Sequence, residues 1–139
     1  MPLPASMLEG ASVQNEIGWR LEDFPSVLER AQQFSLACLG GQFQFRFPDG
    51  TCEMYWLEAN SSERGLGESW PSYVGRSNRE VARAFVDLCA RANFEQEIAS
   101  WEFVRLKREQ GHDPMRHLWF VAYFVSELEW RDLRAKHES

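Results

Sequence analysis

The stretch "FQFRFPDGTCEMYWLE", residues 43–58, predicts a β-hairpin and decides the fold class. Its first half alternates Phe43, Phe45 and Phe47 with polar residues, which is the period-two pattern of a strand with one buried face. The segment Pro48–Gly50 favours a tight turn, because proline fixes φ, aspartate bonds its own backbone and glycine accepts positive φ. We therefore expect two antiparallel strands within residues 42–58.

The second strand of this hairpin has large apolar residues at both odd and even positions. When the alternation is continued across the turn, we expect the side chains of Cys52, Met54 and Trp56 to face inward with those of the three phenylalanines. The same alternation turns Glu53, Tyr55 and Leu57 outward, with Gln44 and Arg46 beside them on the first strand. We expect either the loop that follows or a partner to cover this outer face.

Helix signals surround the hairpin. Ser26 and Glu29 form a capping box that predicts the start of an N-terminal helix, with Cys38 on its apolar face and an end at Gly40 and Gly41. Ser77 and Glu80 form a second capping box before another amphipathic segment. Between them, residues 59–72 read as a long loop, and residues 73–74 as a short strand.

The last third of the chain leaves two interpretations open. Residues 94–110 favour a helix that ends at Gly111. Asp113 and Pro114 then favour a helix start, and we expect one long helix through the apolar run "LWFVAYFV". The alternative is that residues 100–108 and 115–125 are paired strands. The overall prediction is an α+β fold, in which a small antiparallel sheet built on the hairpin 42–58 packs against an N-terminal helix and a mainly helical C-terminal half.

Length and composition predict a single globular domain over residues 1–139. Residues 1–15 contain Pro2, Pro4 and Gly10 and read as a loose N-terminal arm without the features of a signal peptide. The longest apolar run is too short to span a bilayer. Three cysteines, with no CxxC pair, indicate free thiols and a reducing compartment, so we expect a cytoplasmic protein.

Negative charge is concentrated in the first half of the chain. Residues 1–75 contain ten acids and four bases, whereas residues 76–139 contain eleven of each, so the whole formal charge of −6 lies in the first half. An acidic half repels nucleic acids and anionic lipids and favours encounter with a basic protein. We therefore expect neither a nucleic acid nor a membrane as partner.

The sequence shows no catalytic motif. His112 and His117 are five residues apart and do not share a helix face as a metal-binding pair would, so we expect no metal site. Phosphate-loop and nucleophile-elbow patterns are absent. We expect a protein that is not an enzyme and that needs no cofactor.

Aromatic and acidic residues gather in and after the second strand of the hairpin, and large aromatics ringed by charge are typical of interface hot spots. The predicted partner-binding residues are Asp49, Glu53, Tyr55, Leu57, Glu58, Glu63, Glu68, Trp70 and Tyr73. The favoured hypothesis is a bacterial binding protein that neutralises or escorts a basic protein, as an immunity protein inhibits its cognate toxin. The alternatives are a secretion chaperone and a small-molecule-binding or enzymatic domain with dispersed residues, for which Cys52, Glu53, His117 and Tyr123 would be candidates.

Overall fold

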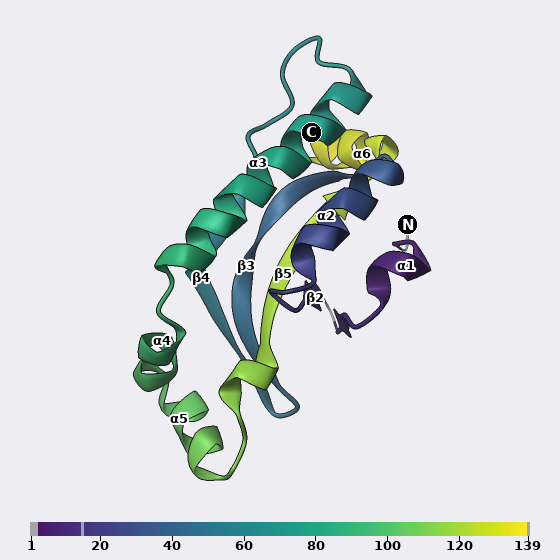
Figure 1. Cartoon of the computed structure of the whole chain (residues 1–139). Coiled ribbons are helices and arrows are strands. Elements are labelled where there is room, and N and C mark those ends of the chain that lie inside the picture. Colours follow the sequence, from purple (N-terminus) through teal and green to yellow (C-terminus); the bar gives the residue numbers. More distant parts are fainter. Residues whose placement is uncertain (1–2, 15, 139) are drawn as a thin grey trace.

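The fold is α+β, with a five-stranded antiparallel sheet in the order β1-β2-β5-β3-β4 (Figure 1). The computed structural model describes residues 3–14 and 16–138. The strands are β1 (Ser12–Val13), β2 (Ile17–Trp19), β3 (Ala37–Phe47), β4 (Gly50–Asn60) and β5 (Leu118–Val125). The helices are α1 (Ala5–Leu8), α2 (Phe24–Gln33), α3 (Trp70–Arg91), α4 (Phe94–Ser100), α5 (Glu102–Glu109) and α6 (Glu127–Glu138), with a 3₁₀ turn, η1, at Pro114–His117.

The predicted hairpin is present as β3 and β4 and is longer than expected. Phe45 pairs with Cys52 and Phe47 with Gly50, so the turn lies at Pro48 and Asp49 as the sequence indicates. The sheet is nevertheless larger than this hairpin, because three further strands from both ends of the chain join it.

Residues 118–125 form a strand, so the prediction of one long helix from residue 114 was wrong. β5 lies in the middle of the sheet between β2 and β3. Its apolar residues face both ways because Phe120 and Phe124 enter the main core while Val121 and Val125 are buried on the other side. The alternative interpretation was right that residues 118–125 form a strand. Residues 100–108 do not pair with this strand, because residues 94–109 contain the helices α4 and α5, as the favoured interpretation predicted.

A capping box marks the change from β5 to α6. The backbone N–H of Ser126 donates to the Glu129 carboxylate, and the backbone N–H of Glu129 donates to the Ser126 hydroxyl. These reciprocal bonds satisfy N–H groups that a helix start otherwise leaves unpaired. Asp113 caps only the short η1 turn, through a bond of 3.1 Å from the backbone N–H of Met115.

Both predicted capping boxes were misplaced. α2 begins at Phe24, with Pro25 in its first turn, and ends at Gln33, so Cys38 lies in β3 and not on a helix. α3 begins after Ser69, whose side chain accepts from the backbone N–H of Ser72, so residues 70–74 are helical and not loop or strand. Ser77 is buried within α3, where its hydroxyl accepts from the backbone N–H of Cys38.

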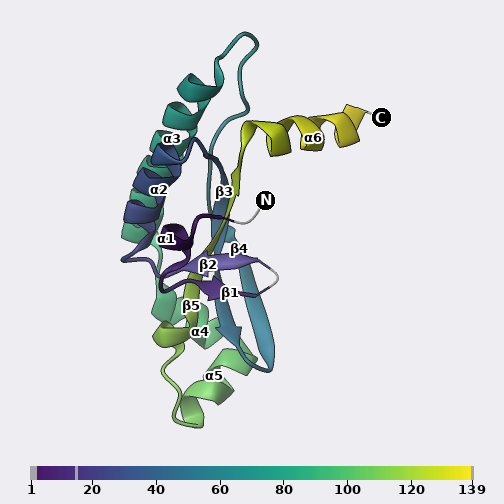
Figure 2. The same cartoon turned by 90° about the vertical axis from the view of Figure 1, so that its right-hand side faces the viewer.

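The main core lies between the sheet and the pair α2 and α3, which cover one face (Figures 1 and 2). Phe120 on β5 is its centre: its ring lies 4.6 Å from that of Phe24 on α2, 4.9 Å from Phe85 on α3 and 5.0 Å from Phe43 on β3. All four rings are buried, and edge-to-face or tilted packing of this kind adds to the gain from burial.

Residues 3–14 differ from the expected loose arm, since they contain α1 and β1. Met7 on α1 is fully buried, and its carbonyl accepts a 2.6 Å hydrogen bond from the indole N–H of Trp19 on β2. β1 pairs with β2 through Ser12 and Gly18. The expected arm also includes residues 1–2 and 15, which lie outside the described residues.

Within the described ranges, no helix packs along the second face of the sheet (Figure 2). Figure 2 shows that α6 extends away from the sheet on the side opposite α2 and α3, and that β1 and β2 also reach toward that side. We call the second face, between α6 and the β1–β2 hairpin, the outer face. Among the described residues, no helix is both long and apolar enough to cross a membrane.

Candidate functional site

Arg46 on β3 organises the middle of the outer face. Its guanidinium donates to the side chain of Gln44 at 3.2 Å, to the Ser12 hydroxyl at 3.0 Å and to the Glu16 carbonyl at 2.7 Å. Arg46 is buried, and these bonds to a neighbouring residue and to the β1–β2 hairpin compensate its loss of water. Arg46 therefore joins the hairpin to the centre of the sheet.

Tyr123 on β5 and Glu16 lie beside this arginine. The Tyr123 hydroxyl donates to the Glu16 carboxylate. Burial and then the adjacent Glu16 raise the pKa of Tyr123 to about 12, with the Glu53 carboxylate adding to the effect. Tyr123 is thus a neutral hydrogen-bond donor at physiological pH, and its ring, 46 % exposed, lies in acidic surroundings.

A bulge in β4 changes which side chains reach the outer face. Gln42 pairs with Glu58 and the next residue, Phe43, pairs with Met54, so residues 55–57 have no partners on β3. This odd number of extra residues reverses the alternation along the strand. The predicted orientations of Trp56 and Leu57 were therefore wrong: Trp56 is 43 % exposed, whereas Leu57 is 5 % exposed and packs in the main core.

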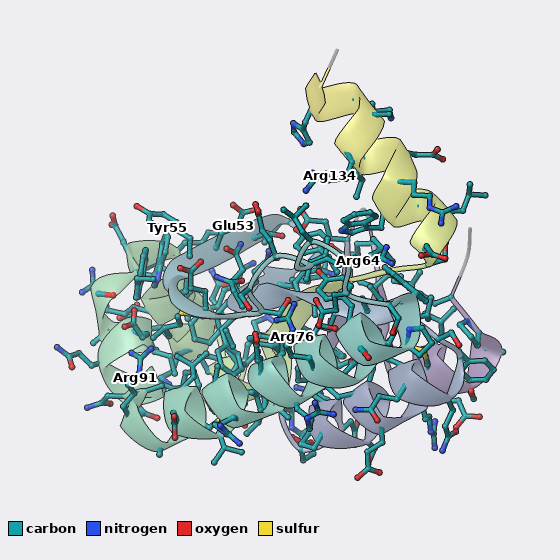
Figure 3. The ribbon with its side chains drawn as sticks, turned by 90° about the horizontal axis from the view of Figure 1, so that it is seen from above. Glu53, Tyr55, Arg64, Arg76, Arg91 and Arg134 are labelled. Carbon is teal, nitrogen blue, oxygen red and sulfur yellow. The ribbon has the colours of Figure 1, made fainter. Side chains whose placement is uncertain are left out.

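The bulge also brings aromatic side chains to the edge of the sheet. Tyr55 is 67 % exposed and makes an edge-to-face contact with Trp56. Trp56 stacks on Trp101 and donates its indole N–H to the Glu97 carboxylate at 3.1 Å. Tyr55 is therefore the large side chain of this strand that remains available, and Figure 3 shows it with Glu53 on the same side of the molecule as α6.

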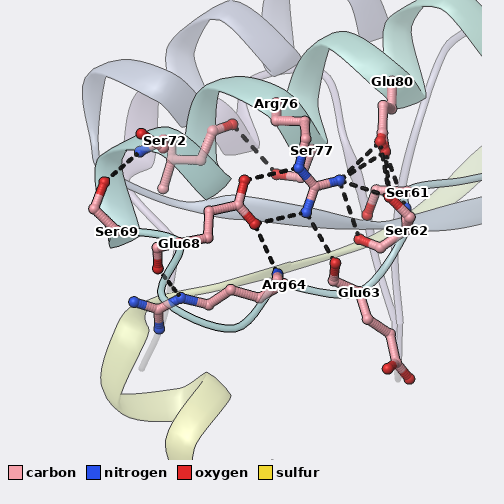
Figure 4. Close-up of polar contacts among 12 residues, drawn as sticks. Ser61, Ser62, Glu63, Arg64, Glu68, Ser69, Ser72, Arg76, Ser77 and Glu80 are labelled. Carbon is pink, nitrogen blue, oxygen red and sulfur yellow. Dashed lines mark hydrogen bonds and ion pairs between the residues drawn. The ribbon is translucent and has the colours of Figure 1, made fainter.

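The loop 61–69 is held by Arg76 on α3, as Figure 4 shows. The Arg76 guanidinium donates to the carboxylates of Glu68 and Glu80 at 2.8 Å and to the Glu63 carbonyl at 2.9 Å. The Arg76 hydrogen bond lowers the pKa of Glu68 to about 2, and the Glu68 carboxylate in turn raises the pKa of Arg76. This loop is therefore tied down by charge-assisted bonds, although its sequence suggests mobility.

The predicted partner-binding residues separate into three groups. Leu57, Trp70 and Tyr73 are buried, Trp70 and Tyr73 in a small core cluster with Val125. Asp49 and Glu68 are ion-paired, with Lys107 at 2.6 Å and Arg76 at 2.8 Å respectively. The remaining residues are exposed and form no ion pair with any described residue: Glu53, Tyr55, Glu58 and Glu63.

Sequence reasoning did not find Glu16, and it named Tyr123 beside Glu53 only as a candidate for dispersed chemistry. The meeting of Glu16 and Tyr123 depends on β2 and β5 being neighbours, and the two residues are 107 positions apart in sequence. A signal for Tyr123 was present, since it interrupts an otherwise apolar run at an alternate position, as an outward residue of a strand does. No local pattern identifies Glu16.

Two neighbouring hollows lie where α6 meets the sheet. The first, of about 290 Å³, has Leu39, Tyr73, Trp130 and Leu133 as its apolar lining. The second, of about 300 Å³, lies between Glu58 and Tyr123, and Leu39 lines it as well. The two hollows adjoin at Leu39, and we call the pair the corner groove, with one hollow beside α6 and the other beside Glu58 and Tyr123.

The candidates for dispersed chemistry do not meet at one place. Cys52 is buried in the main core, whereas Glu53 and Tyr123 lie on the outer face. His117 stacks on Phe47 with ring centroids 4.2 Å apart, and its Nδ1 lies 3.1 Å from the Arg46 carbonyl oxygen. Within the described part of the chain, no group of three or more His, Cys, Asp or Glu residues is arranged to hold a metal ion.

Comparison with known proteins gives no relative. No protein-family model, curated protein or solved structure matches the chain. The function has to be argued from the residues themselves.

Proposed function

We propose that this chain is a non-enzymatic binding protein that neutralises or escorts a partner with a basic surface, and that the outer face is its binding surface. Within this class we favour an immunity protein that covers a cognate toxin. The observation that supports the proposal is the combination of the exposed, unpaired carboxylates of Glu53 and Glu58 with the exposed aromatic rings of Tyr55 and Tyr123. Aromatic anchors surrounded by charge are typical of interfaces in which charge steers association.

The shape of the molecule supports the same proposal. The outer face lies between α6 and the β1–β2 hairpin, which both extend toward the same side (Figure 2). A convex element of a partner fits between such walls, and the bonds of Arg46 keep the hairpin wall in place. A rigid, preformed surface loses less entropy when it binds.

Charge also distinguishes a foreign partner from a second copy of the chain. Two outer faces brought together would oppose Glu16, Glu53 and Glu58 of one copy to the same carboxylates of the other. Like charges placed opposite each other in an interface cost on the order of several kcal/mol, which disfavours such a pairing. We therefore propose a different, basic protein as the partner.

The test is a pull-down from the source cells with the wild-type chain and with the double variant Glu53→Lys/Glu58→Lys. The matched control is Glu102→Lys/Glu109→Lys, which makes the same charge change at exposed positions of α5. We expect one basic protein to bind the wild type and the control and to bind the outer-face variant roughly tenfold more weakly or worse, measured by calorimetry with the purified partner.

Two results would contradict the proposal. One is a partner that binds the outer-face variant and the wild type with equal affinity. The other is a partner whose contact surface is acidic or neutral. Melting curves of both variants show whether folding is retained, and changes at exposed sites should shift stability by only about 0.5 kcal/mol.

A further inference from the structure

The corner groove has two chemically different ends. At the α6 end, the apolar side chains of Leu39, Tyr73, Trp130 and Leu133 form the floor and walls. At the other end, Glu58 and Tyr123 line the groove, and the carboxylates of Glu53 and Glu16 lie near Tyr123 together with one cation, Arg46, so acids outnumber bases there. An occupant of the whole groove therefore needs an apolar group and a cation.

Charge is balanced at the apolar end and negative at the other. Glu63, Arg134 and His137 all line the apolar hollow, so neither sign dominates there. No cation lines the second hollow, and no described residue forms an ion pair with Glu58. The complementary cation therefore belongs near Glu58 and Tyr123.

The size of the groove favours side chains over a free small molecule. Each hollow measures about 300 Å³ or less, which is the lower limit of pockets that enclose small ligands. Both hollows are partly open to solvent, and residues of α6 line the first of them. Open, adjacent hollows of this size suit neighbouring side chains of one polypeptide segment.

Two glycines, Gly40 and Gly41, are part of the lining of the second hollow, where they contribute backbone and no side chain. Gly40 has φ +131°, and a Cβ built on it would lie 2.2 Å from the Asn60 side-chain oxygen. A larger residue is therefore excluded at Gly40 by the neighbouring strand β4, and this part of the hollow's lining stays without a side chain. A backbone lining allows close approach of another chain.

We propose that the corner groove binds an extended segment of a basic protein, with an apolar side chain between α6 and β3 and a lysine or arginine at Glu58 and Tyr123. Alternate residues of an extended segment point to the same side, so an apolar residue followed two positions later by a basic residue fits the two hollows. The proposal rests on the function proposed above and names the part of the partner that is recognised. The apolar residue anchors the segment, and the cation determines the orientation in which the segment lies along the two hollows.

The experiment selects a phage library of random hexapeptides on the immobilised wild-type protein. We expect enrichment of peptides with an apolar residue and a lysine or arginine two positions later. The selected peptides should bind Leu133→Glu and Glu58→Lys at least tenfold more weakly than the wild type, measured by calorimetry with synthetic peptides.

Two variants at the opposite end of the molecule are the controls. Leu106→Glu on α5 matches Leu133→Glu, since the two leucines are 47 % and 41 % exposed. Glu109→Lys on α5 matches Glu58→Lys in charge and exposure. Both controls should bind the selected peptides as the wild type does, and all four variants should give the same circular dichroism spectrum.

The outcomes separate this inference from the proposed function. If the selected peptides bind Glu58→Lys more weakly but bind Leu133→Glu as they bind the wild type, the apolar hollow is not used. That result would contradict the inference about the corner groove and would still agree with an acidic binding face. Enrichment without a basic residue, binding that neither variant weakens, or no enrichment at all would each overturn the inference. The pull-down described above tests the proposed function independently of any of these results.

Discussion

The two faces of the sheet are built from the same strands but are held by different interactions. The inner face, under α2 and α3, is formed by buried aromatic rings that contact one another at 4.6 to 5.0 Å. The outer face has a buried arginine, Arg46, whose hydrogen bonds connect β3 to the β1–β2 hairpin, and it has exposed carboxylates, Glu53 and Glu58, that form no ion pair with any described residue. We therefore expect the buried rings of the inner face to contribute most to stability, and we propose that the outer face is the binding surface.

The largest effect should come from Phe43→Ala on the inner face. This ring is fully buried against Phe85 and Phe120, so its removal leaves a cavity and should lower the free energy of unfolding by about 3–5 kcal/mol. The measurement is urea unfolding followed by tryptophan fluorescence. The matched change on the outer face, Tyr55→Ala, should alter stability by about 0.5 kcal/mol at most. Equal losses in the two variants would remove the distinction between the faces.

Leu57→Ala tests whether the bulge in β4 assigns residues to the two faces. Because Leu57 packs in the main core, its truncation should cost about 2–5 kcal/mol. Trp56→Ala should cost less, about 1–2 kcal/mol, since this partly exposed residue loses the stacking on Trp101 and the hydrogen bond to Glu97. Thermal denaturation of the two variants would contradict the bulge if the larger loss occurred at Trp56.

Arg46→Met tests the hydrogen bonds that hold the outer face together. The variant keeps an apolar stem but loses donors to Ser12 and Glu16, and should cost about 1.5–3 kcal/mol. Hydrogen exchange of the β1 and β2 amides should become faster. Gln42→Met, on the same strand and face, is the control and should leave that exchange unchanged. If the β1 and β2 amides exchange at the wild-type rate in Arg46→Met, the hairpin is held by something else.

The smallest effect should be the pH dependence of the loop 61–69. Arg76 lowers the pKa of Glu68 from its ordinary 4.5 to about 2. The stabilisation of the loop by the ionised Glu68 carboxylate is therefore complete above pH 4.5 and is lost as the pH falls toward 2. Amide chemical shifts of Gly65 and Gly67, followed by NMR between pH 7 and pH 2, should show this loss. In Arg76→Gln the carboxyl should titrate near its ordinary value; a loop that titrates identically in both proteins would show that Arg76 does not hold it.

Local chemistry predicted those parts of the fold that depend on neighbours in sequence. The turn at Pro48 and Asp49, the alternation from Phe43 to Phe47 and the helices within residues 94–109 were predicted from such signals and are present. The capping box of Ser126 and Glu129 was an additional local signal, and it would have separated the strand at 118–125 from α6. The Ser77 and Glu80 pattern was a false signal, because Ser77 bonds β3 and not a helix start.

The candidate site was predicted only in part for the same reason. Glu53, Tyr55 and Glu58 were found because the hairpin carries them, whereas Glu16 and Tyr123 required knowledge of the strand order. The orientations of Leu57 and Trp56 were predicted the wrong way round because the bulge lies in the pairing between strands, where Gln42 pairs with Glu58 and Phe43 with Met54. The alternation along a single strand does not record this pairing.

The sequence by itself determined that this chain forms an α+β fold around a hairpin with one aromatic face, since turn residues and a period of two act over a few positions. Only the tertiary structure decided that β5 enters the centre of the sheet, that Leu57 turns inward and that α6 extends away from the sheet on the side of the outer face (Figures 2 and 3). These features depend on which distant segments pair, and the free energy of that choice comes from burial in the whole core.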